Sequence, residues 1–449
     1  MSAITRILRY TPQYKANFTL AYPVILAQIG QVIVQLADSA MVGHLGSTAL
    51  AAVSFAGALF TIFLFWGTGL ALGLTPLVGE AYACRRPKIA AELLQNALTL
   101  YFFIGVLLFG ILYGLGFLLP YMGQEPEVAE LARPYFLYLA WSIIPYMVFL
   151  AFKQFLEGVG NTRTGMVIVL TANLLNIFFN YLLIYGKFGI PEMGLLGAGI
   201  STLASRIMMV IVFALIFFCT KRYHIYKEGF VHSKINRADF IYLNKLGWPI
   251  ALQMGMETAS FSLSAIMVGW IGTTALAAHQ IMLAISQVCF MMYYGMGAAV
   301  AVRVSNFNGQ NDRVNVRRTA YSGFHIMLGI ALIGALPIFL LRHQLGGWFS
   351  DSQAVSVTVA QLIIPFIVYQ FGDGLQINFA NALRGIADVK PMMYIAFIAY
   401  FLISLPAGYF FGFVMDWGIV GIWMAFPFGL TTAGIMYYLR FRSRTLEKH

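Results

Sequence analysis

Charged side chains are scarce in this 449-residue chain. They make up 10 % of the sequence, whereas hydrophobic residues make up 60 % and the mean hydropathy is +0.78. A soluble domain carries about 25 % charged residues, because its surface has to face water. The composition therefore argues strongly against a soluble all-helical protein. The apolar runs instead reach the roughly 20 residues that a helix needs to cross the hydrocarbon layer of a membrane.

Cysteine and the common catalytic motifs are also missing or rare. Cys84, Cys219 and Cys289 are scattered, with neither CxxC nor metal-ligand spacing, and are predicted to be small packing residues. The GxxxxGK[ST] signature of nucleotide binding is absent, which argues against ATP as an energy source. No Ser/His/Asp set and no HExxH occurs, and the seven histidines are dispersed. We therefore predict that the chain is not an enzyme.

An internal repeat is the clearest positive feature. The segment MVGHLGSTALAA at 41–52 recurs as MVGWIGTTALAA at 267–278, with nine of twelve positions identical and an offset of 226 residues. Pro23 and Pro249 keep the same offset. The chain therefore consists of two diverged copies of one unit. In membrane proteins such a duplication usually places a transport pathway between the copies.

The apolar runs predict twelve membrane spans, six in each copy. They start near residues 18, 50, 93, 132, 164 and 196, and then near 246, 275, 317, 356, 391 and 417. Because six is even, both copies enter from the same side and are predicted to be parallel repeats about an axis along the membrane normal. The first run continues as a full span, so no cleavable signal peptide is expected.

The predicted fold class is thus an all-α integral membrane protein with two six-helix lobes. We assign the N-terminal lobe to 1–220, a basic cytoplasmic linker to 221–245, and the C-terminal lobe with a basic tail to 246–449. We also expect residues 15–220 to superpose on 240–441. Channels more often use symmetric oligomers of short chains, so a monomeric transporter is favoured over a channel.

Basic residues predict the orientation, because cytoplasmic loops collect Lys and Arg. With a cytoplasmic N-terminus, 24 of the 28 basic residues lie in inner segments, including Arg6, Arg9 and Lys448. The remaining four are Arg133, Lys187 and Arg342 outside and Arg206 within the sixth span. Both termini are therefore predicted to be cytoplasmic, in an inner membrane. The net charge of +11 matches anionic inner-leaflet lipids; nucleic-acid binding has no folded module to support it.

Three acidic residues lie inside predicted spans: Asp38, Glu257 and Asp373. A carboxylate within hydrocarbon costs several kcal/mol, so such acids usually face the bundle interior and serve an ion or proton pathway. A hydrogen bond between helices, without a role in transport, is the alternative. Glu257 and Asp373 are predicted near mid-membrane, and Asp38 in the outer half of the first span. The repeat counterpart of Asp38 is Ser264.

The two copies differ in their buried acids, because the second copy carries two mid-membrane carboxylates that the first copy lacks. Glu257 corresponds to Gln31 in the first copy, and Asp373 corresponds to Tyr146. Neither counterpart is charged at neutral pH. Two carboxylates in a low-dielectric site neutralise a cation or share a proton, and either behaviour supports an ion-coupled step.

Further polar and apolar residues complete the predicted site. Phe261, one turn from Glu257, and Met256 suit a pocket for flat apolar substrates. Ordinary polar packing between helices is an equal alternative for each oxygen-bearing candidate ligand. These candidates are Thr258, Gln280, Ser286, Tyr369 and Asn378.

Four strings carry a resemblance to a known family. They are QLADSAMVGHLGSTALAAV, KLGWPIALQMGMETASFSLSAIMVGWIGTTALAAHQI, YYGMGAAVAVRVSNFNG and YQFGDGLQINFANALRGIADVK. Together they resemble the multidrug and toxic compound extrusion transporters, in particular the NorM-type bacterial branch. The resemblance covers essentially the whole chain. It implies two six-helix lobes and antiport, in which inward Na⁺ or H⁺ drives the export of organic cations, with no other cofactor.

The resemblance also implies roles for individual residues. The cation-binding acids of the family fall on Glu257 and Asp373, and its N-lobe acid falls on Asp38. Gln280 and Phe261 fall on positions that relatives use near the substrate or ion, and we add Gln31, Met256 and Tyr369 to the predicted site. Phe290 departs from the pattern, since some relatives have Tyr there, and this leaves Na⁺ or H⁺ coupling open.

The alternative within the wider superfamily is a flippase for lipid or polysaccharide precursors. Such relatives carry more basic residues inside the cleft to hold pyrophosphate, whereas only Arg206 lies within a span here. Acidic groups with aromatic and Met side chains favour lipophilic cations instead, with broad recognition because such walls repack around different shapes. Amphiphilic cationic or zwitterionic drugs, including fluoroquinolones, are the expected cargo.

Overall fold

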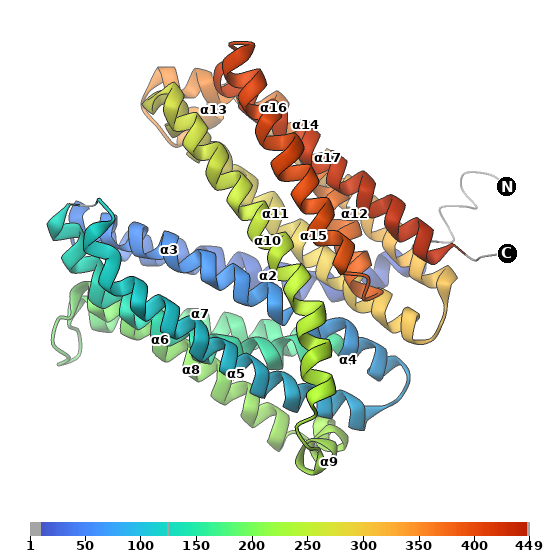
Figure 1. Ribbon diagram of the computed structural model, residues 1–449. Helices are drawn as coiled ribbons and strands as arrows, with labels where there is room; N and C mark the ends of the chain where they lie inside the picture. The colour runs from blue at the N-terminus through green and yellow to red at the C-terminus, as the bar shows by residue number, and fades with distance from the viewer. Residues whose placement is uncertain (1–9, 124, 447–449) are drawn as a thin grey trace. The chain divides into compact units, whose positions relative to one another are not determined.

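The computed structural model describes residues 10–123 and 125–446, so Arg6, Arg9 and Lys448 of the charge pattern lie outside the described residues. Within these ranges the chain forms helices joined by short turns, and no strand occurs in them (Figure 1). The chain divides into two compact units. We call Leu26–Ala251 the N-terminal unit, and Met1–Ile25 together with Leu252–His449 the C-terminal unit. The predicted all-α fold class is confirmed.

The N-terminal unit is organised around α6. This helix packs against α3, α4, α5 and α8, and α7 packs against α8. Because neighbours surround it, α6 is buried on most of its faces, and its apolar residues show no single-sided pattern. The helices of this unit are α2 (Thr11–Gly43, from Leu26 onward), α3 (Ser47–Ala71), α4 (Leu74–Ala83), α5 (Pro87–Leu118), α6 (Pro126–Gly158), α7 (Thr162–Tyr185), α8 (Gly194–Cys219) and α9 (His224–His232).

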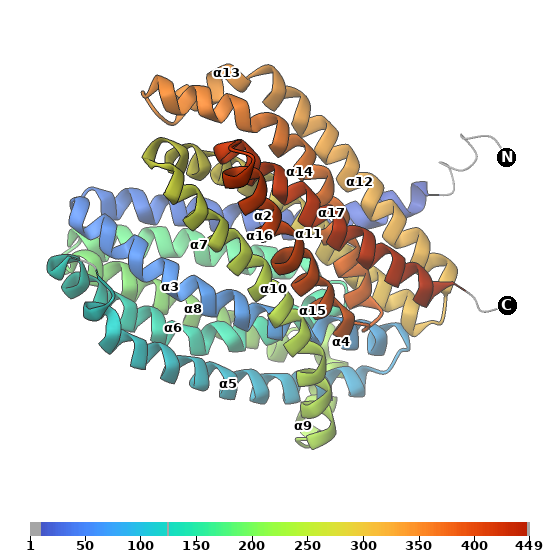
Figure 2. The same ribbon diagram turned by 45° about the horizontal axis from the view of Figure 1, so that its top comes forward.

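The C-terminal unit is organised around α14, which packs against α11, α12 and α17 (Figure 2). The helix before α17 is divided by π-helical stretches at Phe397–Ser404 (η4) and Phe410–Val414 (η5), with Pro406 between them. The helices are α10 (Arg237–Ile271, from Leu252 onward), α11 (Thr273–Gly309), α12 (Arg313–Leu340), α13 (Arg342–Leu345), α14 (Gln353–Gly385), α15 (Lys390–Ala396), α16 (Leu405–Tyr409) and α17 (Gly418–Thr445).

Eleven helical segments of the described chain are long and apolar enough to cross a membrane. They include α3 with α4 as one span and Lys390–Val414 as another. The remaining predicted span is α10, which has 35 residues and is long enough, but carries Gln253, Glu257 and Thr258 in its middle. Of the twelve predicted spans, the one that least resembles a membrane span in composition is thus the helix that carries Glu257. The protein is a multi-pass membrane protein.

The division between the units falls inside two helices. It lies between Ile25 and Leu26 in α2 and between Ala251 and Leu252 in α10, and these two points are 226 residues apart, the offset of the repeat. The units therefore differ from the predicted lobes 1–220 and 246–449, because the first part of each of these helices packs with the other copy. The predicted linker 221–245 contains α9 and the first turns of α10.

The repeat is also visible in helix packing. In the N-terminal unit, a Cβ atom on Gly69 would lie 2.6 Å from the Cα of Ala251. In the C-terminal unit, a Cβ atom on Gly295 would lie 2.9 Å from the backbone nitrogen of Ile25. Both the glycines and their partners correspond at the offset of 226. Each unit therefore contains the same close helix crossing, which requires glycine because backbone meets backbone.

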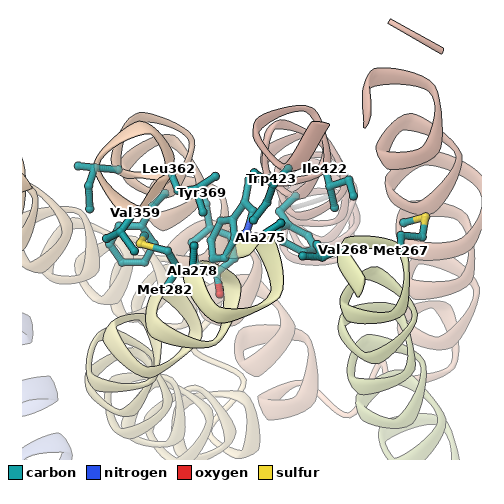
Figure 3. Close-up of a cluster of buried hydrophobic side chains, with 14 of the residues drawn as sticks. Met267, Val268, Ala275, Ala278, Met282, Val359, Leu362, Tyr369, Ile422 and Trp423 are labelled. Carbon is teal, nitrogen blue, oxygen red and sulfur yellow. The ribbon is translucent and has the colours of Figure 1, made fainter. Parts of the chain in front are cut away.

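A hydrophobic cluster joins several helices of the C-terminal unit, and Figure 3 shows part of it. Within it, the Trp423 indole donates a hydrogen bond to Nδ1 of the buried His279 at 3.1 Å. Its members include Met267 and Val268 of α10, Ala275, Ala278 and Met282 of α11, Val359, Leu362 and Tyr369 of α14, and Ile422 and Trp423 of α17. The cluster supports the helices that carry the predicted site.

Candidate ion and substrate sites

Glu257 on α10 is held by two glutamine side chains. Gln253, one turn earlier on the same helix, donates from Nε2 to Glu257 Oε2 at 2.8 Å. Gln376 of α14 donates to the same oxygen at 3.3 Å. The first contact follows from helical spacing, since residues four apart share a face. The second contact joins α14 to α10 through residues that are 119 positions apart in the sequence.

Within the described ranges, the side-chain carbonyl oxygens of the two glutamines remain unpaired near Glu257. Gln376 Nε2 also donates to the Tyr400 hydroxyl at 3.0 Å, so the amide nitrogens of both glutamines are used. Their carbonyl oxygens, Gln253 Oε1 and Gln376 Oε1, are buried and have no hydrogen-bond partner among the described residues. Buried polar atoms are normally paired, so this excess of acceptors requires a positively charged or proton-donating partner.

Asp373 on α14 adds a second carboxylate. Its side chain is buried, and Oδ2 has no hydrogen-bond partner within the described part of the chain. Glu257 is close enough that the two negative charges repel when both groups are ionised. Tyr293 of α11 is also near Asp373, and its hydroxyl is another buried oxygen without a partner in residues 10–123 and 125–446. An uncompensated buried carboxylate is costly, so this site fits a cation or a proton.

Neutral oxygens have to complete any cation site here. Among the residues that the structure describes, no group of three or more His, Cys, Asp or Glu side chains could hold a metal ion. Glu257 and Asp373 supply two negative charges, and the glutamine carbonyls and Tyr293 hydroxyl supply uncharged oxygen. Such a mixture suits a hard cation, which binds oxygen ligands, better than a transition metal, which prefers His and Cys.

An aromatic wall lies next to these carboxylates. Tyr369, one turn before Asp373, accepts a hydrogen bond from Ser286 of α11 at 3.2 Å. The Phe261 ring contacts the Tyr369 ring edge-on at 6.4 Å between centroids and the Phe426 ring at 5.0 Å. Met256 and Phe261 pack against the hydrophobic cluster of Figure 3. The structure therefore places Tyr369, Phe261 and Met256 in the same unit as the two carboxylates.

Asp38 belongs to a separate polar network in the N-terminal unit. Asn180 of α7 donates from Nδ2 to Asp38 Oδ1, and the same nitrogen lies 3.4 Å from Asn176 Oδ1. The Asn176 backbone carbonyl accepts a hydrogen bond from the Ser201 hydroxyl of α8 at 3.0 Å. The network thus connects α2, α7 and α8. Asp38 Oδ1 thus has a neutral hydrogen-bond donor, whereas Asp373 Oδ2 has none among the described residues.

Known proteins are similar to this chain in sequence and in fold. The family model MatE matches residues 23–182 and again 249–410, segments that begin at the repeat offset. The chain is 32 % identical to the multidrug resistance protein NorM of Photobacterium profundum, over 96 % of each chain. The chain belongs to the MatE family. The predicted resemblance to multidrug and toxic compound extrusion (MATE) transporters is confirmed.

Solved MATE structures have the same fold. A mutant of the Vibrio cholerae MATE transporter VcmN superposes with a TM-score of 0.88 at 17 % identity, over 97 % of both chains. The eukaryotic MATE transporter AtDTX14 gives 0.85 at 19 % identity, over 97 % of this chain and all of the other. A MOP superfamily transporter from Pyrococcus furiosus gives 0.85 at 21 % identity, over 96 % of both.

Some predicted ligands of this MATE protein use their polar atoms elsewhere. Thr258 donates to the Met254 carbonyl of its own helix at 3.0 Å. Asn378 donates from Nδ2 to the Ala320 carbonyl of α12 at 3.0 Å, while its Oδ1 is buried without a partner among the described residues. Gln280 lies on an exposed face of α11, and Gln31 on an exposed face of α2. Phe290 is partly buried and contacts the Tyr294 ring at 6.1 Å. The roles of Gln280 and Gln31 stay predictions.

Other residues of the candidate site were not predicted from the sequence. Gln253 and Gln376 stand four and three residues from the two carboxylates, a helical spacing that could have identified them. Tyr400 and Tyr293 come from other helices, and no sequence pattern near them indicates that they lie close to the carboxylates. Arg384 is buried, donates to Asn381 Oδ1 at 3.0 Å, and attracts Glu257 electrostatically.

Proposed function

We propose that this protein is a multidrug efflux antiporter. It exports lipophilic organic cations and amphiphilic drugs across the cytoplasmic (inner) membrane in exchange for Na⁺, with H⁺ as the alternative coupling ion. The family, and the NorM relative named for multidrug resistance, support transport rather than enzymatic chemistry. A monomer that needs no cofactor beyond the coupling ion is sufficient for this function.

The buried oxygens around Glu257 and Asp373 are the observation that carries the proposal. Two carboxylates and three neutral oxygens without donors, Gln253 Oε1, Gln376 Oε1 and the Tyr293 hydroxyl, form an acceptor-rich site among the described residues. A sodium ion takes oxygen ligands of both kinds, charged and neutral. A proton would neutralise only one carboxylate and would leave the glutamine carbonyls unpaired. This difference favours Na⁺.

Exchange follows from competition for negative charge. A coupling cation bound at Glu257 and Asp373 cancels the charge that attracts an organic cation, and two cations in a low-dielectric site repel each other strongly. Binding of one therefore weakens binding of the other, and this coupling is reciprocal. Ion entry from outside would thus promote release of the drug.

Drug efflux in sealed vesicles under separately imposed gradients tests the function. Ethidium loss would be followed by fluorescence while either a Na⁺ gradient or a pH gradient is applied at constant membrane potential. The Na⁺ gradient alone should drive efflux, and Glu257→Gln should abolish this response. Efflux driven only by the pH gradient would assign H⁺ as the coupling ion. Ethidium equilibration that responds to neither gradient would indicate a channel.

The proposed orientation places both termini in the cytoplasm. The support is the distribution of Lys and Arg, with 24 of 28 in segments on one side of the predicted topology. Fluorescent or enzymatic reporters fused to each end should report the cytoplasm. An exterior signal from either end would overturn this orientation.

A further inference from the structure

Arg206 lies at the centre of α8 between two aromatic rings. Its guanidinium carbon lies 5.0 Å from the centroid of the Phe60 ring of α3 and 4.8 Å from that of the Tyr146 ring of α6. Nη1 donates to the Ser142 hydroxyl of α6 at 2.7 Å. Three helices of the N-terminal unit thus hold the guanidinium in one place.

The positive charge of Arg206 has no acidic partner in the described part of the chain. The ion pairs there join Lys153 to Glu157, His224 to Glu228, and Arg440 and Arg444 to Asp388. Aromatic faces and a serine hydroxyl hold a guanidinium without neutralising it. Ionisable groups within membrane spans are rare and usually functional because burying them is costly.

An acid of the opposite charge lies in the same unit. The hydrogen-bonded network of Asp38 passes through Asn180 and Asn176 and reaches the Ser201 hydroxyl of α8, five residues before Arg206 on the same helix. Asp38 is fixed by Asn180, and Arg206 is fixed by Ser142 and the two rings. The unit therefore presents a negative group whose hydrogen-bonded network reaches α8 and a positive group on α8 itself, each held by its own neutral partners.

We propose that Arg206 is the carboxylate-binding residue of a subsite for zwitterionic amphiphiles. The carboxylate of such a molecule binds the planar guanidinium, which suits two parallel hydrogen bonds. Its protonated amine is attracted by Asp38, and its apolar body contacts the partly exposed Tyr146, whereas Phe60 is buried and supports the guanidinium from within the protein. The inference rests on the proposed function and adds a selectivity that an acid-lined cation exporter alone would lack.

A matched pair of substrates tests this subsite. The zwitterionic probe is a fluoroquinolone with a carboxylate and a protonated piperazine, and the cationic probe is its ethyl ester. The transport efficiency of each is measured in the same vesicles, and their ratio is compared among variants. Arg206→Gln should lower the ratio of zwitterion to ester at least about tenfold, because hydrogen bonds between charged groups are lost. Arg206→Lys keeps the charge but not the planar group and should lower the ratio less.

Arg133→Gln is the matched control. Arg133 also lies over an aromatic ring, that of Phe117 at 4.9 Å, but it is exposed at the start of α6. This variant should leave the ratio unchanged. If Arg206→Gln does not fold, Arg206→Lys tests the subsite instead. Its zwitterion-to-ester transport ratio is measured in vesicles, and binding of the two probes is measured with the purified Arg206→Lys protein.

The outcomes separate this inference from the proposed function. Wild-type vesicles that export neither probe nor ethidium under any gradient would overturn the proposed function. Wild-type export of both probes, with a ratio that Arg206→Gln and Arg206→Lys leave unchanged, would overturn the subsite alone. An equal loss of both probes would assign Arg206 a purely structural role and would also overturn the subsite.

Discussion

At the scale of single residues, charged groups in this protein differ in whether an opposite charge lies beside them. Lys153 and Glu157 of α6 form a buried ion pair at 3.8 Å. Asp388 accepts from Arg440 at 2.7 Å and from Arg444 at 3.1 Å. Asp373 has an unpaired Oδ2 and a like-charged neighbour, Glu257. Packing alone accounts for a charge that lies beside its opposite. An unpaired buried charge destabilises the protein, so its presence indicates that a ligand binds it.

Neutralising either carboxylate should therefore abolish coupling without unfolding the protein. Glu257→Gln and Asp373→Asn keep the side-chain shape and remove the charge. We expect gradient-driven ethidium efflux to fall by at least about tenfold, because charged ligand contacts of about 1.5–3 kcal/mol are lost. Efflux rates in vesicles with matched protein content measure the effect.

The control for these two variants is Glu130→Gln. Glu130 lies on an exposed position near the start of α6, so the same loss of charge should leave efflux within about twofold of wild type. Undiminished efflux by Glu257→Gln at normal expression would contradict the site in the C-terminal unit. An equal loss of efflux in Glu130→Gln would show that the effect comes from the total charge of the protein and not from the site.

Gln376 should affect the ion rather than the drug. It connects Glu257 to Tyr400, and Gln376→Met keeps an unbranched side chain but removes the amide. The variant loses a donor to Glu257 and a carbonyl ligand, so the Na⁺ concentration for half-maximal efflux should rise about three- to tenfold. The ethidium concentration for half-maximal efflux should change less. A change in ethidium affinity alone would contradict a role for Gln376 in the ion site.

At the scale of helices, the sequence predicted which segments are helical but not how two of them are shared between units. Apolar runs identify the spans, and turn signals separate them. α10 begins at Arg237, about nine residues before its predicted span, and α9 lies within the predicted linker. Neither segment is apolar enough to be recognised as a span. Their structure depends on tertiary contacts, such as Gly229 of α9 against Lys88 and Ala91 of α5.

The two glycine crossings should be sensitive to a single methyl group. Gly69→Ala would place Cβ 2.6 Å from the Cα of Ala251, and Gly295→Ala would place it 2.9 Å from the nitrogen of Ile25. Because backbone atoms have to move, each should lower stability by about 1–3 kcal/mol. Melting temperatures in detergent should fall for both variants, and efflux should fall in proportion to the folded protein or further.

Gly334→Ala of α12 provides the comparison. A Cβ there has nothing within 4 Å, so the substitution should be neutral or stabilise by about 0.5–1 kcal/mol through helix propensity. Similar melting temperatures for Gly69→Ala and Gly334→Ala would show that the crossing tolerates separation. That result would contradict its importance in holding α10 against α3.

At the scale of the whole molecule, the duplication and the family were accessible from sequence, whereas the environment of the carboxylates was not. Nine identical residues in twelve established the offset, and the offset singled out Glu257 and Asp373 because their counterparts are neutral. Tyr400 and Tyr293 could not be found in this way. They reach the site from helices distant in sequence, and their positions depend on side-chain packing that no local pattern records.

The charge of the cargo should follow from the acids in both units. Monovalent organic cations such as ethidium should be exported and should inhibit one another, because acids at low dielectric attract them and aromatic faces add about 0.5–2 kcal/mol each. Organic anions of the same size and hydrophobicity should be neither exported nor inhibitory, since Glu257, Asp373 and Asp38 repel them. Zwitterions should be carried only because Arg206 accepts their carboxylate. Efflux of a size-matched panel of cations, zwitterions and anions, measured in one vesicle preparation, decides among these cases. Export of the anions without inhibition by the cations would contradict the electrostatic basis of recognition, since no arrangement of these three acids favours a negative cargo.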